Sequence, residues 1–129
     1  MGQIMLNQKA ALATVAVKDI NAARRFYESV LGLRLVHSEQ GVALPFKSGA
    51  TRLLVYQSEY AGTNRATAVT WEVGGDVTAI VQQLGSQGVT FEHYDEMPMK
   101  RTGDVYEADG FQVAWFKDPD GNIHALTGS

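Results

Sequence analysis

Short apolar runs and one helical stripe follow one another in the first half of the chain. Leu12 to Val17 is rich in β-branched residues and predicts a strand. Asp19 has the character of a helix N-cap, and the apolar residues behind it recur at helical spacing until Gly32. Alternating or apolar runs predict three more strands, at residues 33–38, 42–46 and 52–57.

The same order of elements returns in the second half. Thr67 to Val73 predicts a strand, and Asp76 is expected to cap a helix with an apolar stripe at Val77, Ile80, Val81 and Leu84. Further strands are predicted at residues 89–93, 111–117 and 123–126, and residues 94–104 are expected to form a loop. Each half therefore predicts β-α-β-β-β, which makes an α+β fold with a first module at about 12–57, a linker at 58–66 and a second module at 67–126.

The two halves can be superimposed as a repeat. A shift of 56 places Leu12 on Ala68, and a shift of 70 places Phe46 on Phe116 and Val55 on Ala125. The difference between the shifts predicts an insertion of 14 residues in the second half, around 94–107. Identity between the halves is low, so the repeat depends on the order of elements and on matching turns.

Composition narrows the class of protein. With 129 residues, 45% of them apolar, the chain is one globular domain with a real core. A net charge of −3 and the lack of a basic run give no support for nucleic-acid binding, and no apolar run is long enough for a membrane span. Residues 1–11 lack the features of a signal peptide and there is no Cys, so a cytoplasmic protein is expected.

Two motifs carry a family resemblance. Phe26-Tyr27 with Val30-Leu31-Gly32-Leu33, followed later by Asp118-Pro119-Asp120-Gly121-Asn122, resembles the vicinal oxygen chelate superfamily. That group includes glyoxalase I, extradiol dioxygenases and the fosfomycin- and bleomycin-resistance proteins. The resemblance implies two βαβββ modules whose sheets curve into a cup, and a homodimer. Tyr56-Gln57-Ser58 and Ala61-Gly62-Thr63-Asn64 are similar to uncharacterised members.

The resemblance also implies where a metal would bind. Metal-dependent members take ligands from the first and fourth strands of each module, at positions that correspond here to Leu12, Val55, Ala68 and Ala125. All four side chains are apolar, whereas divalent metals need O, N or S donors. We therefore expect neither a metal nor another cofactor.

Other polar residues are weaker candidates for chemistry. His124 follows the motif turn, but strand alternation places it on the face opposite Ala125, so we expect a packed or surface histidine and not a ligand. His37 and His93 are expected to be structural or edge residues. Glu72 shares the cup face and is either a general base, an anchor for a cationic ligand, or a solvent-facing or Arg-paired carboxylate.

If strand alternation holds, the cup is apolar with a few hydrogen-bonding groups, as expected of a small-molecule pocket. The predicted binding residues are Leu12, Thr14, Leu53, Val55, Gln57, Ala68, Thr70, Glu72 and Ala125. The pattern leaves the facing of Phe46 and Phe116 open. Residues 94–107, with Tyr94, Met97, Met99 and Tyr106, either close over the cup or fill a core or dimer interface.

Three functional hypotheses follow. The leading one is a homodimer that binds an apolar or aromatic small molecule without a metal, with drug or metabolite sequestration as the nearest analogy. The second is a lyase, isomerase or dioxygenase-type enzyme that uses Glu72 or a metal held by residues in another register. The third is a scaffold or regulatory dimer whose cup is filled.

Overall fold

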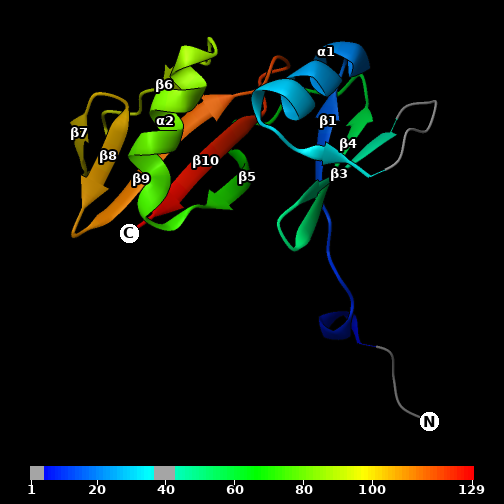
Figure 1. Ribbon diagram of the computed structural model, residues 1–129, viewed down its shortest axis with the longest axis horizontal. Helices are drawn as coiled ribbons and strands as arrows, with labels where there is room; N and C mark the ends of the chain where they lie inside the picture. The colour runs from blue at the N-terminus through cyan, green and yellow to red at the C-terminus, as the bar shows by residue number, and fades with distance from the viewer. Residues whose placement is uncertain (1–4, 37–42) are drawn as a thin grey trace.

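The computed structural model describes residues 5–36 and 43–129, which form two sheets lying side by side (Figure 1). In chain order the elements are η1 Leu6–Gln8, β1 Ala13–Val17, α1 Ile20–Arg24, η2 Arg25–Val30, β2 Arg34–Leu35, β3 Ala43–Ser48, β4 Thr51–Gln57, β5 Thr67–Glu72, η3 Gly74–Asp76, α2 Val77–Ser86, β6 Phe91–Glu92, β7 Lys100–Thr102, β8 Val105–Ala108, β9 Phe111–Lys117 and β10 Ile123–Gly128. The predicted α+β fold is confirmed. His37, a predicted edge residue, and Val42, the predicted start of a strand, lie outside the described residues.

The first sheet has the strand order β1-β4-β3-β2, with β1 and β4 parallel. Its helix begins as predicted: the Asp19 side chain accepts the backbone N–H groups of Asn21, at 3.1 Å, and Ala22, at 3.0 Å. The helical path continues from α1 into the wider turn η2. It ends before Gly32, whose φ of +77° is easily reached only by a residue without a Cβ.

The second sheet has the order β5-β10-β9-β8-β7, and β6 pairs with β9. One prediction holds in part here and another is wrong. Asp76 occupies the N-cap position of α2, as predicted, but its side chain makes no capping bond, and it is also the last residue of the 3₁₀ turn η3. Residues 94–104 are not all loop, since β7 pairs with β8 as a hairpin within the predicted insertion.

Each sheet is apolar on the face that its helical segment covers. One core cluster lies under α1 and η2 and consists of Val15, Val17, Ala23, Tyr27, Leu44, Phe46, Leu53, Val55 and Val69. The other lies under α2 and consists of Val77, Val81, Leu84, Phe91, Val105, Ala114, Phe116 and Leu126. Phe46 and Phe116, whose facing the sequence left open, are therefore equivalent core residues on the helix side, 0% and 1% exposed.

The insertion fills the other face of the second sheet. Tyr106 is fully buried and clusters there with Val113 and Ala125, against Met99 and Trp115. Its hydroxyl donates to Asp95 Oδ1 at 3.0 Å. The sequence left open whether Tyr106 and Met99 close over the cup or fill a core, and the structure places Tyr106 in a core cluster and Met99 against it.

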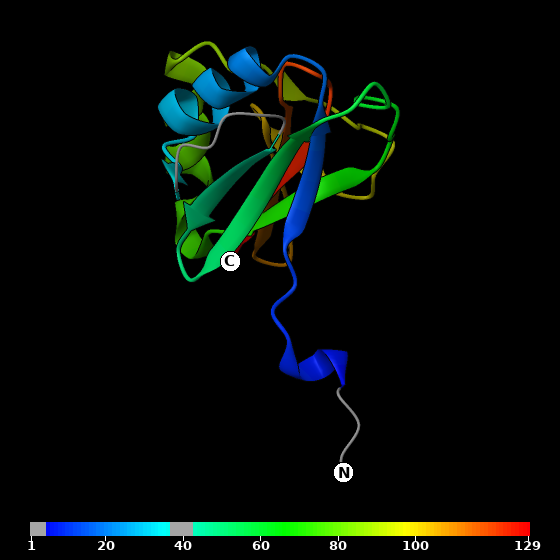
Figure 2. The same cartoon turned by 90° about the vertical axis from the view of Figure 1, so that its right-hand side faces the viewer.

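The N-terminal segment projects away from both sheets (Figure 2). Residues 5–12 are all exposed, including Leu6 and Leu12, which are 84% and 49% accessible. Within the described residues, no helix is both long and apolar enough to cross a membrane.

Candidate functional site

A chain of buried hydrogen bonds crosses the boundary between the two sheets. Trp71 Nε1–H donates to His124 Nδ1 at 3.0 Å, and His124 Nε2 lies 2.9 Å from the Tyr27 hydroxyl. Because the indole can only donate, Nδ1 accepts and the imidazole proton is on Nε2. The Tyr27 hydroxyl therefore accepts from His124 and donates to Asp118 Oδ2 at 2.7 Å.

Asp118 organises the motif turn. Its Oδ1 accepts the backbone N–H groups of Asp120, at 2.9 Å, and Asn122, at 2.8 Å. The Asn122 side-chain amide donates to Asp118 Oδ2 at 2.8 Å and to the backbone carbonyl of Ala16 in β1 at 2.7 Å. The turn thus fixes the second module to the first. Burial and the nearby Asp118 charge raise the pKa of Tyr27, which keeps its hydroxyl protonated as a donor.

His124 is a packed core residue, as predicted. It is 0% exposed and lies on the face opposite Ala125, with its ring stacked 4.9 Å from that of Phe116. Burial lowers the pKa of His124 to about 4, so the imidazole is neutral at pH 7. Both ring nitrogens are engaged, which leaves neither for a metal.

The predicted facing of β4 is wrong. Leu53 and Val55 pair with Ala13 and Val15, so they share the helix side and not the face of Thr14. Gln57 pairs with Val17, so it is on the same side of β4 as Leu53 and Val55, and its side-chain amide donates to the Lys18 carbonyl at 3.1 Å.

A difference in turn length explains the error. Phe46 and Phe116 are related by a shift of 70, but their strand partners Leu53 and His124 are related by 71. The motif turn is one residue longer than the β3–β4 turn, and a one-residue slip moves every following side chain to the other face. The position equivalent to Ala125 is therefore Leu54, not Val55.

The positions that would hold the superfamily's metal do not fit a divalent ion. Leu54 in place of Val55 is still apolar, Leu12 and Ala68 are exposed carbon side chains, and Ala125 is 4% exposed beneath Tyr106. In residues 5–36 and 43–129, no group of three His, Cys, Asp or Glu side chains is placed to share an ion. These positions therefore offer no ligand set for a divalent ion.

The predicted binding residues divide among several places. Leu53, Thr70 and Glu72 line one hollow of about 470 Å³ between the two sheets. Thr14 and Ala68 line a smaller hollow of about 170 Å³ beside the linker. Leu12, Val55, Gln57 and Ala125 line neither.

The larger of these hollows, which we call the inter-sheet hollow, has an apolar floor and charged walls. Leu53, Val69 and Trp71 provide the floor, Arg52 extends from β4, and Glu72 ends β5. Within the described ranges, no Lys or Arg forms an ion pair with Glu72. The Glu72 side chain is exposed to solvent where it lines this hollow.

Sequence reasoning missed Trp71 and Arg52. Trp71 is half-buried, and it lines both the inter-sheet hollow and a second hollow of about 300 Å³ on the helix side. The available signal was a tryptophan within the strand predicted from Thr67 to Val73. His93, by contrast, is the structural surface residue that was predicted, 2.7 Å from Asp104.

Comparison with known proteins gives the same family as the sequence motifs. The model of the Glyoxalase/Bleomycin resistance protein/Dioxygenase superfamily matches residues 9–126. No curated protein matches the chain.

Solved structures share the fold at low identity. A glyoxalase family protein from Enterococcus faecalis has a TM-score of 0.71 at 18% identity, covering 95% of this chain and 99% of its own. Lactoylglutathione lyase from Agrobacterium tumefaciens has a TM-score of 0.69 at 18% identity over 94% of each chain. The fosfomycin resistance protein from Mesorhizobium loti has a TM-score of 0.67 at 17% identity, covering 95% and 92%.

Proposed function

Because this chain belongs to the Glyoxalase/Bleomycin resistance protein/Dioxygenase superfamily, we propose that it binds an aromatic or apolar small molecule without a metal ion. Sequestration of a drug or metabolite is the role we propose for such binding. The observation that carries the proposal is the inter-sheet hollow, which combines an apolar floor with Glu72 and Arg52 and has no metal-ligand set.

The lining of the hollow indicates how a ligand would be held. An aromatic body would pack mainly against the half-buried Trp71, above the buried Val69 and Leu53, and burying the remaining apolar surface is worth roughly 25 cal/mol per Å². Thr70 and Glu72 offer hydrogen-bond acceptors and a negative charge to an amine. Arg52 offers N–H donors and a positive charge to a carboxylate.

A matched set of naphthalene derivatives tests this proposal. Calorimetric titration would compare 1-naphthylmethylamine, 1-naphthoate and 1-naphthol with metal-stripped protein. We expect binding of at least one compound, with Glu72→Gln selectively weakening the amine and Arg52→Gln selectively weakening the carboxylate. Failure of all three to bind, or equal effects of both variants on all three, contradicts the proposal.

A second candidate function uses the same carboxylate. Glu72 lies in the inter-sheet hollow and has the chemistry of a general base, so a metal-free lyase or isomerase is also supported there. Once a turnover is found, Glu72→Gln decides between the two. Loss of turnover with retained ligand binding supports catalysis, and unchanged turnover excludes Glu72 as the base.

We also propose the homodimer that the family resemblance implied. It is supported by large apolar side chains that the single chain leaves exposed: Met5, Leu6, Leu12, Tyr56, Tyr60 and Phe111. Light scattering after gel filtration tests it, and a monomer at micromolar concentration contradicts it.

A further inference from the structure

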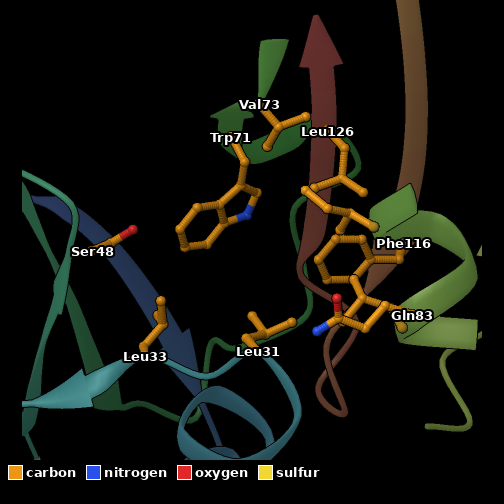
Figure 3. Close-up of a pocket in the computed structure, with 10 residues that line it drawn as sticks. Leu31, Leu33, Ser48, Trp71, Val73, Gln83, Phe116 and Leu126 are labelled. Carbon is orange, nitrogen blue, oxygen red and sulfur yellow. The ribbon is translucent and has the colours of Figure 1, made fainter. Parts of the chain in front are cut away.

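A second hollow lies on the helix side of the sheets, where the superfamily resemblance placed no ligand. It has a volume of about 300 Å³ and opens between the loop after η2 and the helix α2 (Figure 3). Leu31 and Leu33 approach it from the first module, and Trp71, Phe116 and Gln83 from the second. We call it the helix-side pocket. Its volume is at the lower end of the range for small-molecule sites.

Among the described residues that line the helix-side pocket, none carries a charged side chain. The polar side chains in this set are Ser48 on the first module and Gln83 on α2, with the indole of Trp71 between the apolar walls. A charged ligand would lose its hydration here without gaining an ionic partner, which is costly. The pocket therefore favours an uncharged compound with one or two hydrogen-bonding groups.

Two aromatic residues of the pocket are held in fixed positions. Trp71 on β5 and Phe116 on β9 flank His124 on the intervening strand β10, and both rings lie within 11° of parallel to the imidazole. The hydrogen bond from Trp71 Nε1 to the buried His124 also fixes the orientation of the indole. Because Phe116 is 1% exposed, the half-buried Trp71 is the ring that a ligand can contact, and a side chain that is already ordered loses little entropy when an aromatic ring packs against it.

We propose that the helix-side pocket is a binding site for an uncharged aromatic compound of two to three rings, distinct from the inter-sheet hollow. The two hollows share Ser48, Trp71 and Val73, but Glu72 and Arg52 line only the inter-sheet hollow. The proposal does not require the inter-sheet hollow to bind anything.

Two fluorescent probes that differ in charge test whether the pocket binds an aromatic compound and whether it prefers an uncharged one. N-phenyl-1-naphthylamine is neutral, whereas 8-anilino-1-naphthalenesulfonate has a similar ring system with a negative charge. We expect the neutral probe to bind at least about tenfold more tightly. In a Trp115→Phe background, energy transfer from Trp71 should report that the bound probe is near the indole. No binding of the neutral probe, or tighter binding of the anion, overturns the proposal.

Substitutions on α2 locate the probe. Gln83 lines the pocket, and its exposed neighbour Gln82 does not, so the two positions form a matched pair. Gln83→Glu and Gln83→Lys should each weaken the neutral probe about tenfold, whereas Gln82→Glu should leave its affinity unchanged. Equal effects at both positions, or opposite effects of the two charges, overturn the proposal.

A last control separates the two hollows. Glu72→Gln and Arg52→Gln should not change the affinity for N-phenyl-1-naphthylamine. If either variant weakens this probe as much as Gln83→Glu does, the neutral probe binds in the inter-sheet hollow and the helix-side site is wrong.

Discussion

The indole of Trp71 is hydrogen-bonded to the buried imidazole of His124, with Nε1 donating to Nδ1 at 3.0 Å. This bond connects a half-buried residue, which lines both hollows, to the core. Through His124 it continues to Tyr27 and Asp118, and so to the turn that binds the first module. The position of the aromatic wall between the two hollows therefore depends on the packing of both modules.

Trp71→Phe is expected to destabilise the fold beyond the loss of ring area. The variant leaves His124 Nδ1 buried without a donor, which costs about 1–3 kcal/mol. Urea unfolding at pH 7 measures the loss of unfolding free energy in Trp71→Phe. The control is Trp115→Phe, which makes the same change of ring at a half-buried residue on the other face of the sheet. An equal loss of unfolding free energy in the two variants would show that the bond to His124 contributes little.

Acid should destabilise the protein through His124. Burial holds the pKa of the folded imidazole at about 4, below its ordinary value of 6.5. The unfolded chain therefore takes up a proton near pH 6.5 while the folded chain does not, so stability is highest above that pH and falls until about pH 4. The loss from this residue is about 3 kcal/mol over the interval, at roughly 1.4 kcal/mol per pKa unit.

Carboxylates also change the stability of the protein between pH 7 and pH 4. Subtracting the pH profile of His124→Gln from that of the wild type leaves the part that is due to His124. Unfolding free energies of wild type and His124→Gln would be measured from pH 7 to pH 4, with His93→Gln as the exposed control. We expect the wild type and His93→Gln to lose about 3 kcal/mol more than His124→Gln. Parallel pH profiles for all three proteins would contradict the account of His124.

Gly62 should be more sensitive to substitution than Gly32. Both have left-handed backbones, with φ of +76° and +77°, so alanine incurs a similar cost of about 1 kcal/mol at either position. At Gly62, however, a Cβ would overlap the carbonyl oxygen of Asp120, whereas no atom lies near the Cβ position of Gly32. Thermal unfolding should show a clearly larger loss for Gly62→Ala, and equal melting temperatures would contradict the close approach of linker and turn.

Much of the fold could be predicted from local patterns. Asp19 and Gly32 delimit the first helix through cap chemistry that needs no tertiary context, and period-two alternation places His124 opposite Ala125. The apolar character of the metal positions was also readable, because correcting Val55 to Leu54 exchanges one carbon side chain for another.

The sites were harder to predict because they depend on register and on contacts between modules. The motif turn has one more residue than the β3–β4 turn, so the repeat alignment assigned Leu53 and Val55 to the wrong face of β4, whereas they lie in the core. The helix-side pocket is lined by Trp71 from a strand of the second module and by Leu31 and Leu33 from a loop of the first. No local sequence pattern indicates that these two segments lie together. The missing capping bond of Asp76 was not predictable from the helical stripe either, since the stripe does not encode the η3 turn in which Asp76 lies.

The central claim is that this chain binds small molecules without a metal. Calorimetric titration of the naphthalene set would be repeated with protein dialysed against EDTA and with the same protein given one equivalent of Zn²⁺, Ni²⁺ or Mn²⁺. We predict the same Kd in all samples, and no metal-dependent rise in melting temperature. Binding that disappears after EDTA and returns with one of the ions would contradict the claim.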